Sequence, residues 1–381
     1  MKNLATQPRG VSRRSFIARA GAAGAVATSL ALGGRFTSQG APAAGDSPGN
    51  GKAQSDPSRP PETGSQRLSV VKLQAWEALG YGMFIHFGMS TFVGKELDET
   101  ARIPWPDGKT PPSSYNPDKL DADQWIQIAG DAGMKYAVLT TKHIDGHCLW
   151  PSRYTDYTVA TSGNKTDVVE AFVKACERRG VLPGFYYCSW DNHNLFGSVT
   201  PSRIEFEKAY TTSFYQDFQT AQVTELLKNY GTVAEMWIDI PGVLGRGYRT
   251  YLYEYMASLQ PNCVIMMNSA EGSTYPVSYA WPSDLIAIER SMPPPPGHVK
   301  WREIEGKRYY LPGEVCDTIG KTWFYTEGDH PRPDNELLTM LSESRRRGVN
   351  LLLDVGPNEH GLISDEYRDA LMRLRKNAKL S

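Results

Sequence analysis

The chain has 381 residues, with 41 Lys and Arg against 42 Asp and Glu, so its net charge is −1 when the histidines are neutral. No basic patch stands out along it, which argues against a nucleic acid as partner. The cysteines, which are scattered and odd in number, argue against a disulfide framework and a zinc cluster; they are Cys148, Cys176, Cys188, Cys263 and Cys316.

The first 43 residues have the pattern of an export signal. A twin-arginine pattern lies in Ser12–Ile17, an Ala/Gly-rich stretch covers 20–34, and Ala41-Pro42-Ala43 has the form of a cleavage site. We therefore expect export by the twin-arginine route to the periplasm or the extracellular space, without a stable membrane span; a disordered basic arm is the alternative. Removal of residues 1–43 would leave 35 basic and 42 acidic residues, a net charge of −7.

Residues 44–66 are rich in Gly, Pro, Ser and charged residues and show no apolar period, so they are predicted to form a flexible linker. Residues 67–381 remain, enough for one large domain. Apolar strands and helices alternate along it. The predicted strands are 82–87, 135–142, 181–188, 233–240, 263–268, 285–289 and 350–355. The predicted helices are 121–132, 167–179, 212–229, 249–259, 335–347 and 364–377.

This alternation is typical of an α/β fold with a parallel sheet. Residues 296–333 look irregular, although there is room for an eighth strand near 310–315. We therefore predict a single-domain (β/α)8 TIM-type barrel. An open doubly wound sheet is the rival, and it is weakened because no glycine-rich nucleotide-binding loop follows any strand.

Nearly every predicted strand ends in a side chain capable of chemistry. In chain order these are His86, His143, Tyr186 with Tyr187, Asp239, Asn268, Glu289 and Asp354. The carboxyl ends of all strands of a barrel meet at one face, where active sites of this fold lie. We therefore expect these groups to converge on one site.

Two carboxylates are the strongest catalytic candidates. Asp239 closes the apolar strand 233–240, a costly place for a charge unless the carboxylate is paired or functional, and Glu289 has the same anatomy. Carboxylates about 5 Å apart serve a retaining glycosidase. The alternatives are a helix cap or buried ion pair for Asp239 and a surface ion pair with Arg290 for Glu289.

His86 and His143 are expected to hydrogen-bond a polar substrate, although a histidine at a strand end can also be a satisfied core group. Asp145 and His147 are close to His143 in sequence, but this spacing after a strand does not hold three ligands on one metal easily, so we expect no metal and no cofactor. The aromatic rings expected at the same rim suit the C–H faces of a sugar; they are Trp150, Trp190, Trp237, Trp281, Trp301, Trp323 and Phe324.

Six segments in the right order resemble the α-L-fucosidases of glycoside hydrolase family 29. They are Gly82–Gly88, Lys135–His143, Gly184–Tyr187, Met236–Asp239, Glu314–Gly320 and Asn350–Pro357, so the resemblance covers essentially the whole barrel. It implies a retaining glycoside hydrolase that releases terminal α-L-fucose from fucosylated glycans. The β-sandwich that many members carry behind the barrel has no room here, since the chain ends one helix after 350–356.

The resemblance also implies roles for individual residues. Asp239 would be the nucleophile, and Trp323 would pack against the fucose methyl. Other sugar contacts would come from His86, His143, Tyr186, Trp237 and the loop residue Glu96. The acid/base lies in a variable part of the family, and Glu289 is assigned to it by its spacing and its place at a strand end. Glu271 and Glu314 are the reserve candidates.

Three positions depart from the family pattern. Ile144 stands where a second histidine is usual, Leu97 where a tryptophan is usual, and Asn268–Ala270 lacks a frequent arginine. Because a lost polar contact can change sugar preference by orders of magnitude, two alternatives stay open. One is a glycosidase for a different deoxy or methylated sugar, and the other is a non-catalytic carbohydrate-binding protein.

Overall fold

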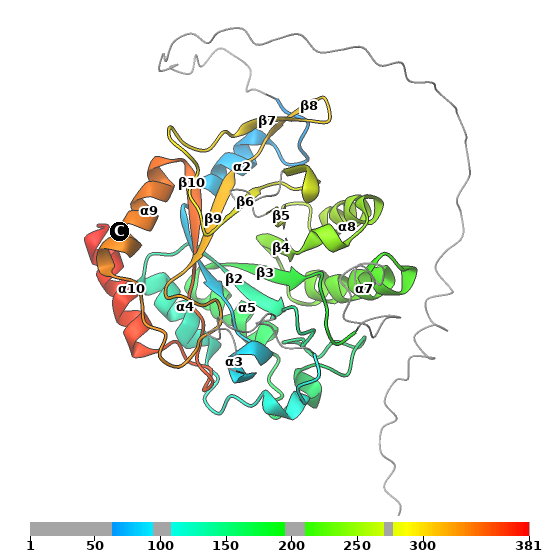
Figure 1. Ribbon diagram of the computed structural model, residues 1–381, viewed down its shortest axis with the longest axis vertical. Coiled ribbons are helices and arrows are strands. Elements are labelled where there is room, and N and C mark those ends of the chain that lie inside the picture. The colour runs from blue at the N-terminus through cyan, green and yellow to red at the C-terminus, as the bar shows by residue number, and fades with distance from the viewer. Residues whose placement is uncertain (1–62, 94–107, 195–209, 270–276, 381) are drawn as a thin grey trace, which may run out of the picture. The chain divides into compact units, whose positions relative to one another are not determined.

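Eight parallel strands form the centre of the computed structural model, which describes residues 63–93, 108–194, 210–269 and 277–380 (Figure 1). The strands are β1 (Tyr81–Ile85), β2 (Tyr136–Lys142), β3 (Leu182–Cys188), β4 (Glu235–Asp239), β5 (Val264–Met267), β6 (Ile286–Glu289), β9 (Gly313–Thr318) and β10 (Val349–Asp354). They pair in the order β5-β4-β3-β2-β1-β10-β9-β6, and β5 and β6 face each other to complete the ring. The predicted TIM-type barrel is confirmed.

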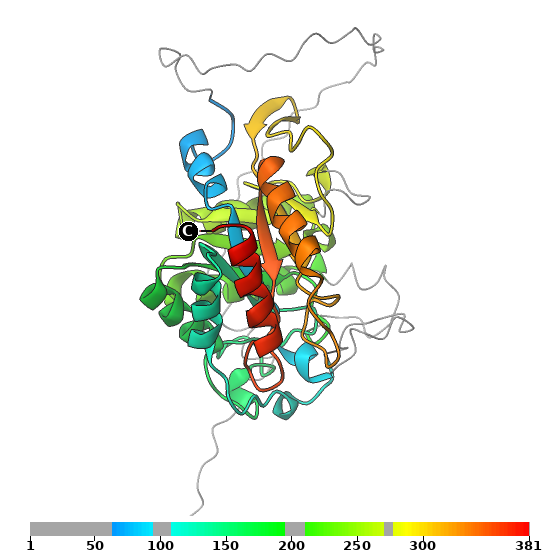
Figure 2. The same cartoon turned by 90° about the vertical axis from the view of Figure 1, so that its left-hand side faces the viewer.

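Helices cover the outside of the barrel. The α-helices are α2 (Val70–Glu77), α3 (Met89–Val93), α4 (Ala122–Asp131), α5 (Val168–Arg179), α7 (Ser213–Asn229), α8 (Arg246–Leu259), α9 (Asp334–Arg346) and α10 (Asp365–Asn377). Short 3₁₀ turns are η1 (Pro112–Ser114), η2 (Val159–Thr161), η3 (Pro241–Val243) and η4 (Val277–Tyr279). Figure 2 shows α9 and α10 side by side on the outer surface.

The helix boundaries follow from capping side chains. Asp121, Asp167, Thr212 and Ser364 each accept a hydrogen bond from a backbone N–H of the first helical turn, which would otherwise be unsatisfied. At the other end of α5, Gly180 takes the left-handed conformation that glycine adopts without strain. These are the boundaries that the sequence predicts within a few residues.

The strands are buried on both faces, which is why they are nearly continuous apolar runs. Alternate residues belong to two packed clusters. One set, such as Met83 and Leu139, packs in the cluster that also contains the helices, while the other, such as Phe84 and Trp237, packs with rings from the other strands. All five cysteines are buried free thiols. Over the described residues, no helix combines the length and the apolar character needed to cross a membrane.

The ring is closed between β5 and β6 by side chains as well as backbone. Asp284 N–H donates to the Ile265 carbonyl over 2.8 Å, and the Asp284 carboxylate accepts from Ile265 N–H over 2.9 Å. Ser283 Oγ accepts from Met267 N–H over 3.1 Å. Arg67 pairs with the buried Asp284 carboxylate. Polar side chains thus satisfy strand donors that a regular ladder would otherwise satisfy.

An antiparallel hairpin of β7 (Trp301–Ile304) and β8 (Lys307–Tyr310) lies beside α2, with its Tyr310 end at the amino ends of the strands (Figure 1). Tyr310 Oη donates to Glu77 over 2.5 Å, and Lys300 pairs with Glu77 over 2.7 Å. Ser65 N–H donates to the Arg308 carbonyl over 2.7 Å, so the last residues of the predicted linker pack on this hairpin.

Several elements differ from the sequence prediction. Helices α2 and α3 were not predicted, the hairpin occupies the region that looked irregular, and the eighth strand lies at 313–318 rather than 310–315. The aromatic residues also separate. Trp301 packs against Tyr310 of the hairpin, at the barrel end away from the predicted site, whereas Trp281 packs against Tyr309 and its carbonyl accepts from Arg249 of α8. The expectation that Trp301 lies at the rim of the site is wrong.

Candidate active site

The carboxyl ends of the strands bring together the predicted site residues that the structure describes. His86 follows β1, His143 follows β2, and Tyr186 lies on β3. Asp239 ends β4, and Glu289 ends β6. Glu96 and the reserve candidate Glu271 lie outside the described residues, as do Leu97 and Ala270.

The Asp239 carboxylate is held by three hydrogen bonds. Tyr186 Oη donates to Oδ2 over 2.6 Å. Oδ1 accepts from the Ile240 backbone N–H and from Asn268 Nδ2, both over 2.8 Å. These bonds fix the orientation of the carboxylate, which suits a nucleophile.

Glu289 is bonded to the same Asn268 side-chain amide as Asp239. Asn268 Nδ2 donates to Glu289 Oε2 over 3.2 Å as well as to Asp239, so the bonded oxygens of the two carboxylates are at most about 6 Å apart. Burial raises the pKa of Glu289, and the charge of Asp239 raises it further, against the Asn268 bond and Arg290. A carboxyl group that keeps its proton beside an ionised partner can act as a general acid.

Arg290 is engaged with residues other than Glu289. Its guanidinium lies over the Trp323 ring, 4.9 Å from the centroid, and donates to the Lys321 carbonyl over 3.1 Å. Among the ion pairs of the described residues, none joins Arg290 to Glu289. The surface ion pair that was the alternative reading of Glu289 is therefore not formed.

The two histidines are buried beside one another, with ring centroids 5.8 Å apart. His86 Nδ1 lies 2.7 Å from Asp354 Oδ1, and the same oxygen accepts the His86 backbone N–H over 3.2 Å. Burial lowers the pKa of His86 to about 3 and also lowers that of His143. Both rings are therefore neutral near pH 7 and can serve as hydrogen-bonding groups.

Aromatic rings connect the histidines to the carboxylates. His143 stacks on Tyr186 at 5.7 Å between centroids, and Tyr186 stacks on Trp237 at 5.4 Å. Trp323 lies 5.0 Å from His86, and Phe324 lies 4.9 Å from His143. These residues form a continuous wall that ends at the carboxylates, because Tyr186 also bonds Asp239. Such a wall suits a ring with one apolar face and several hydroxyl groups.

Known proteins are similar to this chain in sequence and in fold. The family model described as Alpha-L-fucosidase matches residues 51–376. The chain belongs to the α-L-fucosidase family. It is similar to Alpha-L-fucosidase 1 of Arabidopsis thaliana, with 33% identity over 320 residues, 76% of this chain and 56% of that relative. It is also similar to a putative α-L-fucosidase 1 of Oryza sativa subsp. japonica, with 30% identity over 331 residues, 80% of this chain and 57% of that relative.

The chain thus spans a little more than half the length of these two plant relatives. Among solved structures, it resembles α-L-fucosidase isoenzyme 1 from Paenibacillus thiaminolyticus with a TM-score of 0.67 and 30% identity, covering 81% of this chain and 75% of that one. A putative α-L-fucosidase from Bacteroides thetaiotaomicron gives a TM-score of 0.68 and 29% identity, covering 80% and 66%. The predicted family is confirmed.

Glu314, the second reserve candidate for the acid/base, lies inside the barrel. Its carboxylate accepts from Tyr136 Oη over 2.6 Å and from Trp237 Nε1 over 3.3 Å. It is fully buried next to Glu235, and burial raises the pKa of both carboxyl groups. Glu314 therefore supports Trp237 from within the barrel, a structural place that does not suit an acid/base.

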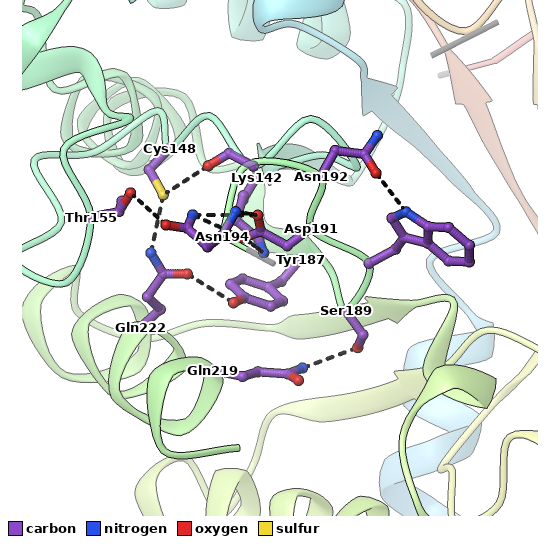
Figure 3. A network of polar contacts seen from close by, with 12 residues as sticks. Lys142, Cys148, Thr155, Tyr187, Ser189, Asp191, Asn192, Asn194, Gln219 and Gln222 are labelled. Atoms are coloured by element: carbon purple, nitrogen blue, oxygen red, sulfur yellow. Dashed lines mark hydrogen bonds and ion pairs between the residues drawn. The ribbon is translucent and has the colours of Figure 1, made fainter. Parts of the chain in front are cut away.

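A buried polar network holds the loops after β2 and β3 together (Figure 3). Lys142 Nζ pairs with Asp191 Oδ2 over 2.8 Å, and both side chains are fully buried. Lys142 Nζ also lies over the Tyr187 ring, 4.3 Å from its centroid. Burial is the largest single influence on Lys142 and lowers its pKa, but Asp191, Tyr215 and Cys148 together more than offset it, so the pKa of Lys142 is raised. Because His143 follows Lys142 directly, this pair anchors the backbone that carries the histidine.

Sequence reasoning did not assign roles to Asn268, Asp354 or the Lys142–Asp191 pair. Asn268 and Asp354 were visible as polar strand ends, but their partners are distant in sequence, as Asp191 is from Lys142. Over the described residues, no cluster of three His, Cys, Asp or Glu side chains could hold a metal ion. His147 is instead 2.8 Å from Ser162 Oγ, and Ile144 packs against the interior rings.

Proposed function

We propose that this protein is a retaining glycoside hydrolase that releases terminal α-L-fucose from glycans. The observation that carries the proposal is the shared amide of Asn268, which keeps the Asp239 and Glu289 oxygens at most about 6 Å apart. Retaining glycosidases place their carboxyl groups about 5–5.5 Å apart, and inverting enzymes need about 6.5–9.5 Å to admit a water. Membership of the α-L-fucosidase family supports the choice of sugar.

The mechanism follows from the different protonation states of the two carboxyl groups. Glu289 gives its proton to the leaving oxygen while Asp239 attacks the anomeric carbon, forming a glycosyl-enzyme. Glu289, now ionised, takes a proton from water, and the hydroxide attacks the same carbon and releases Asp239. Two inversions retain the configuration. Tyr186, which bonds Asp239 over 2.6 Å, keeps the nucleophile oriented.

The wall of the site accounts for recognition of fucose. His86 and His143 are neutral and buried, so each ring can exchange a hydrogen bond with a sugar hydroxyl. Trp237 and Trp323 offer apolar ring surface, which suits the C–H face and the methyl group of a 6-deoxy sugar. The loop residue Glu96 is proposed as a further hydroxyl contact.

A panel of 4-nitrophenyl glycosides tests the activity. We expect release of nitrophenol from the α-L-fucoside, with a kcat/KM at least about tenfold above that for any other sugar, the effect of one good contact of about 1.4 kcal/mol. Preference for another deoxy or methylated sugar would keep the reaction class and replace the substrate. Binding of fucose without hydrolysis of any glycoside would support a carbohydrate-binding protein instead.

We also propose that the chain is exported by the twin-arginine route. The Arg13-Arg14 pair in residues 1–43 supports this. Replacement of both arginines by lysine should retain the precursor inside the cell, and equal export of both forms would refute the route. The five buried thiols are compatible with folding before export.

A further inference from the structure

Asn268 occupies the position between the two proposed catalytic carboxylates. Its backbone N–H donates to the Ile238 carbonyl over 2.8 Å, which ties the end of β5 to β4. Its side-chain Nδ2 donates to Asp239 Oδ1 over 2.8 Å and to Glu289 Oε2 over 3.2 Å. A primary amide nitrogen carries two hydrogens, so it can make both bonds at once.

This amide also spans the place where the barrel has no regular ladder. Asp284 and Ser283, just before β6, bond Ile265 and Met267 along β5. At the carboxyl ends, the bond from Asn268 to Glu289 crosses between the same two strands. The separation of Asp239 and Glu289 therefore depends on a side chain.

The charges around Glu289 show what a neutral donor does here. Asp239 of β4 and Asp317 of β9 raise the pKa of Glu289 together with burial, while Arg290 and the Asn268 bond lower it. Asp317 is itself paired with Arg332 over 2.9 Å. The buried Cys316 thiol of β9 also interacts with Glu289, because burial and then the charge of Glu289 raise the pKa of the thiol. The Asn268 amide lowers the pKa of Glu289 through one hydrogen bond and adds no charge. A cation at this place would strongly stabilise the ionised carboxylate of Glu289.

We propose that Asn268 is a positioning residue that sets both the spacing of Asp239 and Glu289 and the pH up to which Glu289 keeps its proton. This rests on the proposed function of the two carboxylates. A neutral amide restrains the distance of Glu289 from the nucleophile without adding a positive charge that would strongly favour loss of the Glu289 proton.

Three substitutions of Asn268 should move the alkaline limb of the pH profile of kcat/KM, two of them to higher pH and one to lower pH. That limb reports loss of the Glu289 proton in the free enzyme. Asn268→Ala removes a donor that stabilises the ionised Glu289 carboxylate and should raise the limb by about 0.5–1 pH unit. Asn268→Asp, which is nearly isosteric, adds a negative charge and should raise it further. Asn268→Arg should lower it by about one unit or more.

An aryl α-L-fucoside with a poor leaving group, such as the phenyl compound, is the substrate for these profiles, because its cleavage depends on the acid. Asn262→Ala and Asn262→Arg are matched controls. Asn262 is exposed near the opposite end of β5, so its variants should leave the limb within about 0.2 unit of the parent. Limbs that stay in place, or that move the same way in all three Asn268 variants, would overturn the proposal.

Infrared difference titration compares the same variants without turnover. The Glu289 carboxyl band is identified by its disappearance in Glu289→Gln. The titration of Glu289 should shift in the same order, upwards for Ala and Asp and downwards for Arg. Absence of hydrolysis with correctly ordered shifts would refute the proposed function and retain the role of Asn268. Hydrolysis with unmoved titration would refute the role of Asn268 alone.

Discussion

Asp239 and Glu289 carry the same functional group but lie in different surroundings. Asp239 accepts three hydrogen bonds, from Tyr186, Ile240 and Asn268. Glu289 accepts one long bond from Asn268 and is otherwise raised in pKa by burial and by the charge of Asp239. The environment, and not the side chain, therefore distinguishes the proposed nucleophile from the proposed acid.

Azide products distinguish the two roles by stereochemistry. Asp239→Gly should lower kcat by on the order of 10⁴-fold, because no side chain remains to attack the sugar. Azide can then attack the substrate directly in one displacement, so the product from an α-L-fucoside should be the β-azide. Formation of the α-azide by this variant, identified by NMR of the product, would contradict the assignment of Asp239 as nucleophile.

Glu289→Ala should give the opposite product. The nucleophile is intact, so the glycosyl-enzyme still forms from a substrate with a good leaving group, and azide then replaces the activated water. Two displacements retain configuration, and we expect the α-azide together with an increase in rate of on the order of tenfold or more. Failure of azide to accelerate 4-nitrophenyl fucoside cleavage would assign the acid/base role to another residue.

A buried ion pair joins the loops after β2 and β3, with one charged side chain from each side. Lys142 ends β2, and Asp191 follows β3 and also accepts the Asn194 backbone N–H over 2.6 Å (Figure 3). Gly146 approaches this carboxylate so closely that a Cβ there would lie 2.5 Å from Asp191 Oδ1. Its φ of 91° is also one that glycine adopts readily. The pair therefore fixes the path of the backbone on both sides of His143.

Lys142→Met should destabilise the protein by about 3–5 kcal/mol, because it leaves the Asp191 carboxylate buried without its partner. Urea unfolding monitored by circular dichroism measures the change. Lys174→Met is a matched control, since Lys174 pairs with Glu170 and both side chains are more than half exposed. Its expected effect is below about 0.5 kcal/mol, and an equal loss in both variants would argue against the anchoring role of Lys142.

The barrel interior contains a pair of buried carboxyl groups, Glu235 of β4 and Glu314 of β9. Burial raises the pKa of Glu235, and the charge of Glu314 raises it further. A carboxyl whose pKa is raised in the folded state binds its proton more tightly there than in the unfolded chain. Its contribution to stability is therefore fully present at pH below its ordinary value and is lost as the pH rises through the raised value.

Glu235→Gln should flatten this dependence. Between about pH 5 and pH 8 the parent protein should lose unfolding free energy, by about 1.4 kcal/mol for each pKa unit of the shift, and the variant should lose less. Chemical unfolding at a series of pH values provides the comparison. Glu254→Gln, at an exposed position of α8, should keep the parent profile; parallel profiles for all three proteins would refute the prediction.

The sequence predicted most of the barrel because its strands are buried on both faces, which gives short apolar runs that end in polar residues. It misplaced the eighth strand because Tyr309 and Tyr310 are apolar enough for the barrel but pair with Trp301 and Arg302 in the hairpin. Asp239 and Glu289 were visible as strand ends. The bridging by Asn268 was not, because which strand ends share a hydrogen bond depends on the order and tilt of strands in three dimensions.

The position of Thr63 has a practical consequence for handling the protein. The described chain starts beside the hairpin and α2, at the amino ends of the strands, whereas Asp239 and Glu289 lie at the carboxyl ends. A tag or surface linkage attached ahead of residue 63 therefore joins the barrel at the end remote from these two carboxylates. Attachment to a solid support through that segment should leave kcat/KM for a small aryl fucoside unchanged.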